Sequence, residues 1–167
     1  RPGAEVDPVL LGGGQERGRR AGTVDVAAVV GFGAAVREVL AERERTAAAV
    51  AVLGERLLAG LAAMDGVVVT ASGVPRLPGI VHVCVPGVER EELVLLADRA
   101  GLAVSGGSAC ASGALEPSHV LVAMGVDPGV ARGALRCSLG WDATEDDVAR
   151  ALAVLGEVIA HLRSAGA

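Results

Sequence analysis

The sequence predicts a mixed α/β fold, of α+β or α/β type, in which one long helix precedes a small sheet that helices cover. Three observations lead to this prediction: a long Ala-rich helical stretch, several apolar runs too short for helices, and later amphipathic segments with helical spacing. With 167 residues, of which 51% are hydrophobic, the chain suits one domain, or one and a fraction, with a real core. Elements in this order form layers of helix on sheet.

The first regular element is the long helix, expected from Val24 to about Met64 after a loop-like segment rich in Gly and Arg. Its residues favour helix, and the segment REVLAERERT supplies a charged face. Gly66 follows the end of the helix. The last turns place four leucines on one stripe: Leu53, Leu57, Leu58 and Leu61.

Strands are expected at 67–72 and 79–85, because VVVTAS and GIVHVCV are short apolar runs separated by a loop with two prolines. LAVS predicts a short strand that runs into a glycine-rich loop, and ALRCSLG, residues 134–140, predicts a longer one. Alternation in ALRCSLG places Cys137 on an apolar face and Arg136 on the opposite face.

Three shorter helices complete the predicted fold. EREELVLLADRAG is amphipathic, with Leu93, Leu96 and Ala100 expected to face inward. EPSHVLVAMG predicts a short helix with Pro117 in its first turn. The last helix is expected to begin at a capping box, with Thr144 as the N-cap and Asp147 as its partner. Its apolar stripe consists of Val148, Leu152, Leu155, Ile159 and Leu162.

The charge pattern argues against a nucleic-acid surface. The chain has 15 Lys and Arg residues against 20 Asp and Glu residues, without a run of like charge. All of these 15 basic residues are Arg, because the sequence contains no Lys. No segment has the pattern of a membrane span or a signal peptide, so we expect a cytoplasmic protein with no membrane partner.

The three cysteines differ in their surroundings. They are odd in number and widely spaced, which fits neither a disulfide framework nor a zinc site. Cys84 and Cys137 lie in apolar strands and are expected in the core. Cys110 lies in SGGSACASG, residues 105–113, where small neighbours leave the thiol uncovered and glycines let the backbone move. Such a loop suits a reactive thiol, and a tight turn packed with small residues is the alternative.

Two further residues suit anion binding. The guanidinium of Arg136 matches a carboxylate in a two-point contact, although most surface arginines are simply solvated. GGGQERGRRAGT leads into the long helix, so Gly22 and Thr23 are expected at a helix N-terminus that favours an anion. Gly-rich turns before helices are common, and this pattern alone is not specific.

The segments GGGQERGRRAGT, SGGSACASGALEPSHVL and ALRCSLG, in this order, resemble the pyridoxal-phosphate-dependent cysteine desulfurases of the NifS-like kind, in the class-V aminotransferase family. The resemblance covers essentially the whole chain, but only the C-terminal part of the family's length. It implies the small α+β domain of a fold-type I pyridoxal-phosphate enzyme. Residues 1–45 would be the tail of the large domain with the start of the interdomain helix, and residues 46–167 the small domain.

The resemblance also implies a role for each singled-out residue. Cys110 would take the sulfur of L-cysteine as a persulfide, leaving L-alanine, and Arg136 would bind the substrate carboxylate. Thr23 would bind the cofactor phosphate of the neighbouring subunit in a homodimer. Cys110 would also be a transient ligand when an iron–sulfur cluster forms on a scaffold partner, one of the possible sulfur acceptors.

The absence of Lys sets this chain apart from the complete family pattern. The family holds pyridoxal phosphate on a Lys of the large domain, which lies upstream of the matching part. We therefore expect this chain to be inactive without a large domain in the same or a separate chain. Two alternatives stay open: a non-catalytic persulfide carrier or dimerisation module, and a related selenocysteine lyase or cysteine sulfinate desulfinase.

Overall fold

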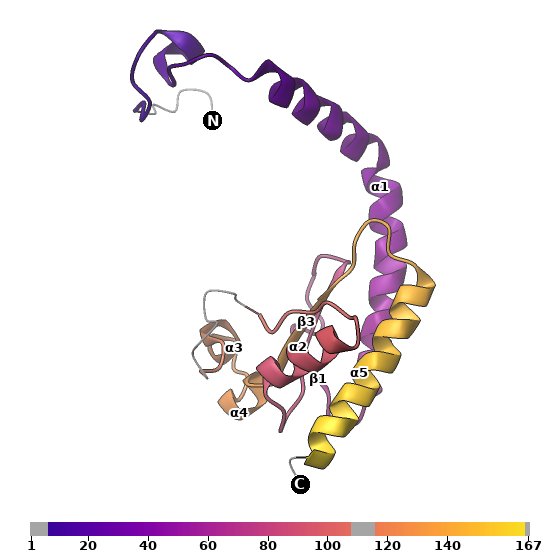
Figure 1. Cartoon of the computed structure of the whole chain (residues 1–167). Helices are drawn as coiled ribbons and strands as arrows, with labels where there is room; N and C mark the ends of the chain where they lie inside the picture. Colours follow the sequence, from indigo (N-terminus) through magenta and orange to yellow (C-terminus); the bar gives the residue numbers. More distant parts are fainter. Residues whose placement is uncertain (1–6, 108–115, 166–167) are drawn as a thin grey trace. The chain divides into compact units, whose positions relative to one another are not determined.

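The computed structural model describes residues 7–107 and 116–165. The chain divides into two compact units, Arg1–Arg43 and Glu44–Ala167, and each is described by itself. The elements follow the predicted order (Figure 1). In sequence they are the short 3-10 helix η1 (Gln15–Gly18), α1 (Val26–Ala62), β1 (Val68–Val69), β2 (Ile80–Cys84), α2 (Arg90–Arg99), α3 (His119–Ala123), α4 (Pro128–Ala131), β3 (Ala134–Ser138) and α5 (Glu145–Ala165).

The sheet is antiparallel, with the strand order β1-β2-β3. In the register of β2 and β3, Ile80 lies opposite Ser138 and Cys84 lies opposite Ala134. Strand β1 contributes two residues, and Val68 lies opposite Cys84. The predicted mixed fold, a long helix followed by a small sheet with helices, is confirmed.

The main core lies between one face of the sheet and three helices. It joins the last turns of α1 to α2 and α5, and Figure 1 shows α5 beside those turns of α1. Gly54 in α1 permits a close approach, because a Cβ there would overlap the carbonyl oxygen of Pro78. The largest side chains of this cluster that are fully buried are Leu57, Leu61, Val81, Val83, Leu135, Val148 and Leu155.

Among the described residues, a small apolar cluster covers one end of the opposite face of the sheet. There Cys84 and Ala134 pack with Leu121 of α3 and Ala131 of α4. Farther along the same face, Arg136 is exposed and His82 is half-buried. This face therefore leaves polar side chains open beside a small apolar cluster.

The capping box at the start of α5 is confirmed. The Thr144 N–H donates to Asp147 Oδ2 at 2.9 Å, and the Asp147 N–H donates to Thr144 Oγ1 at 3.2 Å. The hydrogen bonds from the Thr144 side chain and backbone hold the pKa of Asp147 below its usual value. The local signal at 144–147 thus determines where the last helix begins.

Several elements differ from the sequence-based expectations. The predicted first strand stops after Val69, because Ala71 adopts a left-handed φ of 55° and turns the chain. LAVS forms a single bridge, from Ser105 to Arg136, and no longer strand. Pro117 lies outside α3, which begins after Ser118. Ala100 is exposed, and the neighbouring α2 turn instead buries Ala97.

Helix α4 was not predicted from the sequence. It is one turn long, with Pro128 at its start. Asp127 precedes it, and the Asp127 Oδ1 accepts hydrogen bonds from the N–H groups of Gly129 and Val130. This N-cap and proline signal is short enough to be taken for an ordinary turn.

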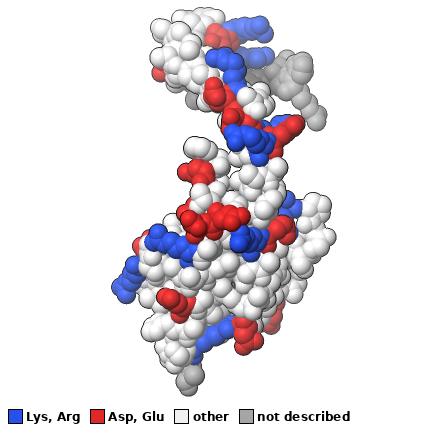
Figure 2. Space-filling view, turned by 90° about the vertical axis from the view of Figure 1, so that its right-hand side faces the viewer, with Lys and Arg blue, Asp and Glu red and all other residues white. Residues whose placement is uncertain are grey.

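The surface charges are mixed in sign. In the face shown in Figure 2, basic and acidic side chains lie next to one another. Elsewhere in the described chain opposite charges pair directly, as Arg56 does with Glu145 at 2.9 Å. Within the described ranges, no helix combines the length and the apolar character that a membrane crossing requires.

Candidate functional site

A row of polar residues crosses the open face of the sheet. From one edge of the sheet to the other, the row consists of Thr70, His82, Arg136 and Ser105. Each of these residues lies directly opposite the next one on the neighbouring segment. Directly opposite residues of antiparallel segments place their side chains on the same face. We call this side of the sheet the polar face.

Arg136 exchanges two backbone hydrogen bonds with Ser105, with N···O distances of 2.7 and 3.1 Å. His82 instead turns its carbonyl oxygen toward Thr70, whose N–H donates to it at 3.2 Å. Because the N–H and C=O of one residue point to the same neighbour, His82 and Arg136 form a non-hydrogen-bonded pair. In such pairs the Cα atoms are about 4.5 Å apart and the side chains approach each other most closely.

The electrostatics of His82 reflect this neighbour. Burial lowers the pKa of His82 below its ordinary value of 6.5, and the positive charge of Arg136 lowers it further. The His82 ring is therefore neutral at physiological pH. Within the described ranges, no hydrogen bond or ion pair to the Arg136 side chain is found, so its charge is available on the polar face.

The same row ends at the root of the glycine-rich cysteine loop. Ser105 Oγ contacts both the carbonyl oxygen of Gly107, at 3.2 Å, and the Gly107 N–H, at 3.3 Å. Gly107 has a φ of 116°, a conformation that glycine adopts without strain. The loop therefore leaves the sheet beside Arg136.

The buried Arg90 supports this loop root. A Cβ on Gly106 would lie 3.2–3.3 Å from three atoms of the Arg90 side chain, so the loop packs on the Arg90 stem. The Nε of Arg90 donates to Glu91 Oε1 at 2.7 Å, and its backbone N–H donates to the Arg132 carbonyl oxygen at 3.1 Å. The sequence did not single out Arg90, because its burial depends on the packing of α2 against the loop.

Cys110 itself lies outside the described residues. The other two cysteines are buried free thiols, as the sequence predicted. Burial raises the pKa of Cys84, and it raises the pKa of Cys137 to about 11. Neither described thiol is therefore a suitable nucleophile at neutral pH.

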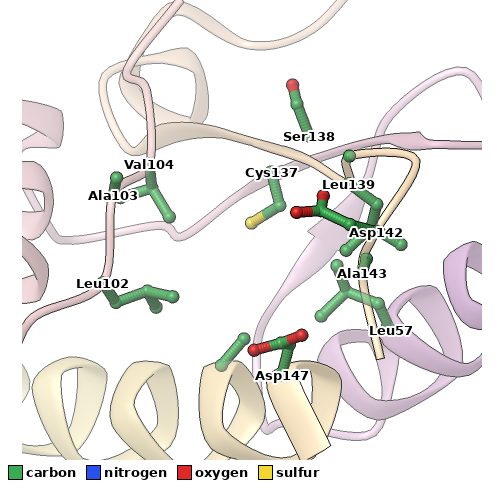
Figure 3. A pocket seen from close by; sticks show the side chains of 12 residues that line it. Leu57, Leu102, Ala103, Val104, Cys137, Ser138, Leu139, Asp142, Ala143 and Asp147 are labelled. Carbon is green, nitrogen blue, oxygen red and sulfur yellow. The ribbon is translucent and has the colours of Figure 1, made fainter. Parts of the chain in front are cut away.

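A pocket of about 320 Å³ lies on the other side of the sheet from the polar face. The Cys137 sulfur points into it, while the neighbouring Ser138 hydroxyl points away (Figure 3). Leu57 and Leu102 line its apolar part, and Asp142 contributes a carboxylate. Cys137 and Arg136 lie on opposite faces of β3, so the sheet separates this pocket from the polar face.

Thr23 belongs to the first unit and is exposed there. The Arg20 Nη1 donates to the carbonyl oxygens of Gly22 and Thr23, both at 3.0 Å. Asp25 occupies the helix N-terminus: its Oδ1 accepts the Ala28 N–H at 3.0 Å. Thr23 therefore lies just ahead of α1, and the Ala28 N–H in the first turn is already bonded to a carboxylate of the chain itself.

The chain does not contain a complete site for pyridoxal phosphate. Covalent attachment of this cofactor needs an amine side chain, and no Lys is present in the sequence. The described residues contain no group of three His, Cys, Asp or Glu side chains that could hold a metal ion. Among the described residues, the groups singled out for anion binding are the Arg136 guanidinium on the polar face and the exposed Thr23.

Thr70 is a site residue that sequence reasoning missed, and His82 was given no role. The signal lay in the pairing register: both are polar residues at positions that alternate with buried ones, on strands whose partners were unknown. Only the pairing register brings Thr70 next to His82 and His82 next to Arg136.

Comparison with known proteins places the chain in a family. The family model for class-V aminotransferases matches residues 5–151. The chain is 44% identical over 160 residues to an IscS-like cysteine desulfurase of Mycobacterium tuberculosis, covering 95% of this chain and 41% of that protein. It is 42% identical over 164 residues to the cysteine desulfurase IscS of Methanosarcina thermophila, covering 98% and 41%.

The fold agrees with the same group of proteins. A solved structure of a NifS-like protein superposes with a TM-score of 0.81 at 32% identity, covering 96% of this chain and 41% of that one. The chain thus spans about two-fifths of the length of the relatives it matches. With its sequence match over most of its length and its fold, the chain belongs to the class-V aminotransferase family.

Proposed function

We propose that this chain is the part of a cysteine desulfurase that binds the carboxylate of L-cysteine and receives its sulfur. Arg136 holds the carboxylate, and Cys110 is the nucleophile. The observation that supports this most is the pairing of Arg136 with Ser105, because the cysteine loop starts there. Cys110 follows Ser105 by five residues, which is about 17 Å of fully extended chain.

The sulfur transfer conserves atoms and electrons. The Cys110 thiolate attacks the sulfur of L-cysteine, so that a bond between the two sulfurs forms and the substrate Cβ–S bond breaks. The bonding electron pair passes to the substrate carbon skeleton, which takes up a proton and leaves as L-alanine. Pyridoxal phosphate, when bound, supplies the electron sink for this pair. Cys110 then passes the persulfide sulfur to an acceptor such as an iron–sulfur scaffold.

A large domain, in the same chain or in a neighbouring one, completes this site. It contributes the Lys that this chain lacks, and Thr23 contributes a hydroxyl to the cofactor phosphate. The exposed apolar side chains of α1 support such a second body, because Val29, Val30 and Phe32 are each more than half exposed. A homodimer of complete proteins would supply this cover.

The test uses two substitutions that fail in different ways, with a large domain supplied in cis from the Mycobacterium tuberculosis relative. Cys110→Ser should still bind L-cysteine but form no persulfide and release no sulfide. Arg136→Ala removes a charge-assisted contact of about 1.5–3 kcal/mol, so KM should rise about ten- to a hundredfold. Arg136→Lys should restore only part of the affinity, since an ammonium lacks the planar two-point contact.

Matched controls separate the site from general effects. Cys84→Ala removes a buried thiol, and Arg56→Ala removes an exposed guanidinium of an ion pair with Glu145. Both should keep sulfide release and KM near the parent values. Sulfide release by Cys110→Ser, or an unchanged KM in Arg136→Ala, would contradict the role of that residue.

A further inference from the structure

The hydroxyl of Thr70 makes two contacts with His82, and together they define the state of the ring. Thr70 Oγ1 lies 3.1 Å from the His82 carbonyl oxygen and 2.7 Å from His82 Nδ1. A hydroxyl has one proton to donate. If that proton pointed at Nδ1, Thr70 Oγ1 and the His82 carbonyl oxygen would lie 3.1 Å apart with no proton between them.

The consistent arrangement has the hydroxyl donating to the His82 carbonyl oxygen and accepting from His82 Nδ1–H. In a neutral ring, Nε2 then carries the lone pair and is an acceptor. Thr70 binds the ring on the β1 side, whereas Arg136 lies opposite His82 on the β3 side. The acceptor edge is thereby turned away from Thr70.

We infer that His82 is a positioning residue for Arg136: Thr70 holds the ring through Nδ1, and Nε2 is the acceptor to which the Arg136 guanidinium donates when it turns to grip a carboxylate. In the structure, the two side chains are neighbours and are not hydrogen-bonded to each other. This inference rests on the proposed role of Arg136 in carboxylate binding. The guanidinium has five N–H donors, so one bond to Nε2 leaves two parallel donors for a carboxylate.

The pair also limits the charge of the site. A neutral His82 adds an acceptor without adding a second positive charge beside Arg136. Among the groups opposite His82 on its neighbouring strands, Arg136 on β3 is charged and Thr70 is uncharged. The site therefore presents one cation, which suits a single carboxylate better than a dianionic phosphate.

The first test is ¹⁵N NMR of the ring nitrogens in this chain alone, with His119 and His161 as internal references. At neutral pH, His82 should carry its proton on Nδ1. Thr70→Val should shift the proton to Nε2, and the control Thr46→Val on α1 should change nothing. A parent ring protonated on Nε2 would overturn the inference.

A second measurement does not depend on the fold of Thr70→Val. Arg136→Gln removes the charge beside His82, so the pKa of His82 measured by NMR should rise, whereas Arg56→Gln should leave it unchanged. An unchanged pKa in Arg136→Gln would mean that the two side chains do not approach each other.

The kinetic test uses the chain with the large domain in cis. His82→Phe should raise KM for L-cysteine about tenfold with kcat little changed, since one hydrogen bond to the charged guanidinium is lost. His82→Gln, which retains an acceptor, should stay closer to the parent. If Arg136→Ala raises KM and His82→Phe does not, the positioning role is wrong while the proposed function stands. If neither raises KM, the carboxylate site itself is wrong.

Discussion

Two glycine substitutions that are chemically identical should change the stability in opposite directions. Gly133 directly precedes β3, and a Cβ there would overlap the carbonyl oxygen of Val85 and lie 2.9 Å from that of Val88. Both obstacles are backbone atoms, which cannot move aside as a side chain can. Gly156 lies inside α5, where a Cβ would meet only the Met64 methyl group at 3.8 Å, an ordinary contact.

The magnitudes follow from these surroundings. Gly133→Ala forces overpacking that costs about 1–3 kcal/mol and disturbs the Val85 N–H bond to the Gly133 carbonyl oxygen, now 2.8 Å long, which adds about 1 kcal/mol. Gly156→Ala removes backbone freedom from the unfolded chain and should stabilise by about 0.5–1 kcal/mol. The two variants should therefore differ by roughly 2.5–5 kcal/mol.

The assay is urea unfolding followed by far-ultraviolet circular dichroism, with the slope m compared among the parent and both variants. In thermal unfolding, Gly133→Ala should lower the Tm by roughly 4–16 °C, at about 2–4 °C per kcal/mol for a chain of this size. A Gly133→Ala variant as stable as the parent would refute the close approach of β3 to the segment after β2.

The stability should also depend on the protonation of His82. Because its folded pKa lies below 6.5, the unfolded chain binds the proton first as the pH falls. The free energy of unfolding should thus decrease below about pH 6.5, and His82→Gln should flatten this part of the profile. A thiol reagent should modify Cys110 first in the native chain, because burial protects Cys84 and holds Cys137 at a pKa of about 11. Faster modification of either buried thiol would contradict the packing of β2 and β3.

The longer helices α1, α2 and α5 could be predicted because their signals are local. The start of α5 is a capping box within four residues. The burial of Leu57 on α1 and of Leu155 on α5 follows from apolar residues spaced three and four apart along each helix. The ends of the strands could be predicted less accurately. The turn after Thr70 depends on the left-handed conformation of Ala71, a residue that rarely adopts it.

The site was predictable as separate residues, but its arrangement was not. The alternation in ALRCSLG was sufficient to place Arg136 on the polar face and Cys137 in the core. The neighbours of Arg136 depend on which strand pairs with β3 and in which register, and no local pattern contains that information. His82 and Ser105 are 54 and 31 residues away along the chain, and the sheet brings both opposite Arg136.

The most direct test of the proposed function is the mass of the Cys110 peptide after a single turnover. With the large domain in cis and no sulfur acceptor, L-cysteine should add one sulfur atom to Cys110, and one L-alanine should form for each sulfur bound. A reductant should remove this sulfur as sulfide and restore the parent mass. L-Alanine formed with an unmodified Cys110, or with the added sulfur on Cys84 or Cys137, would contradict the role of the loop cysteine as the sulfur acceptor.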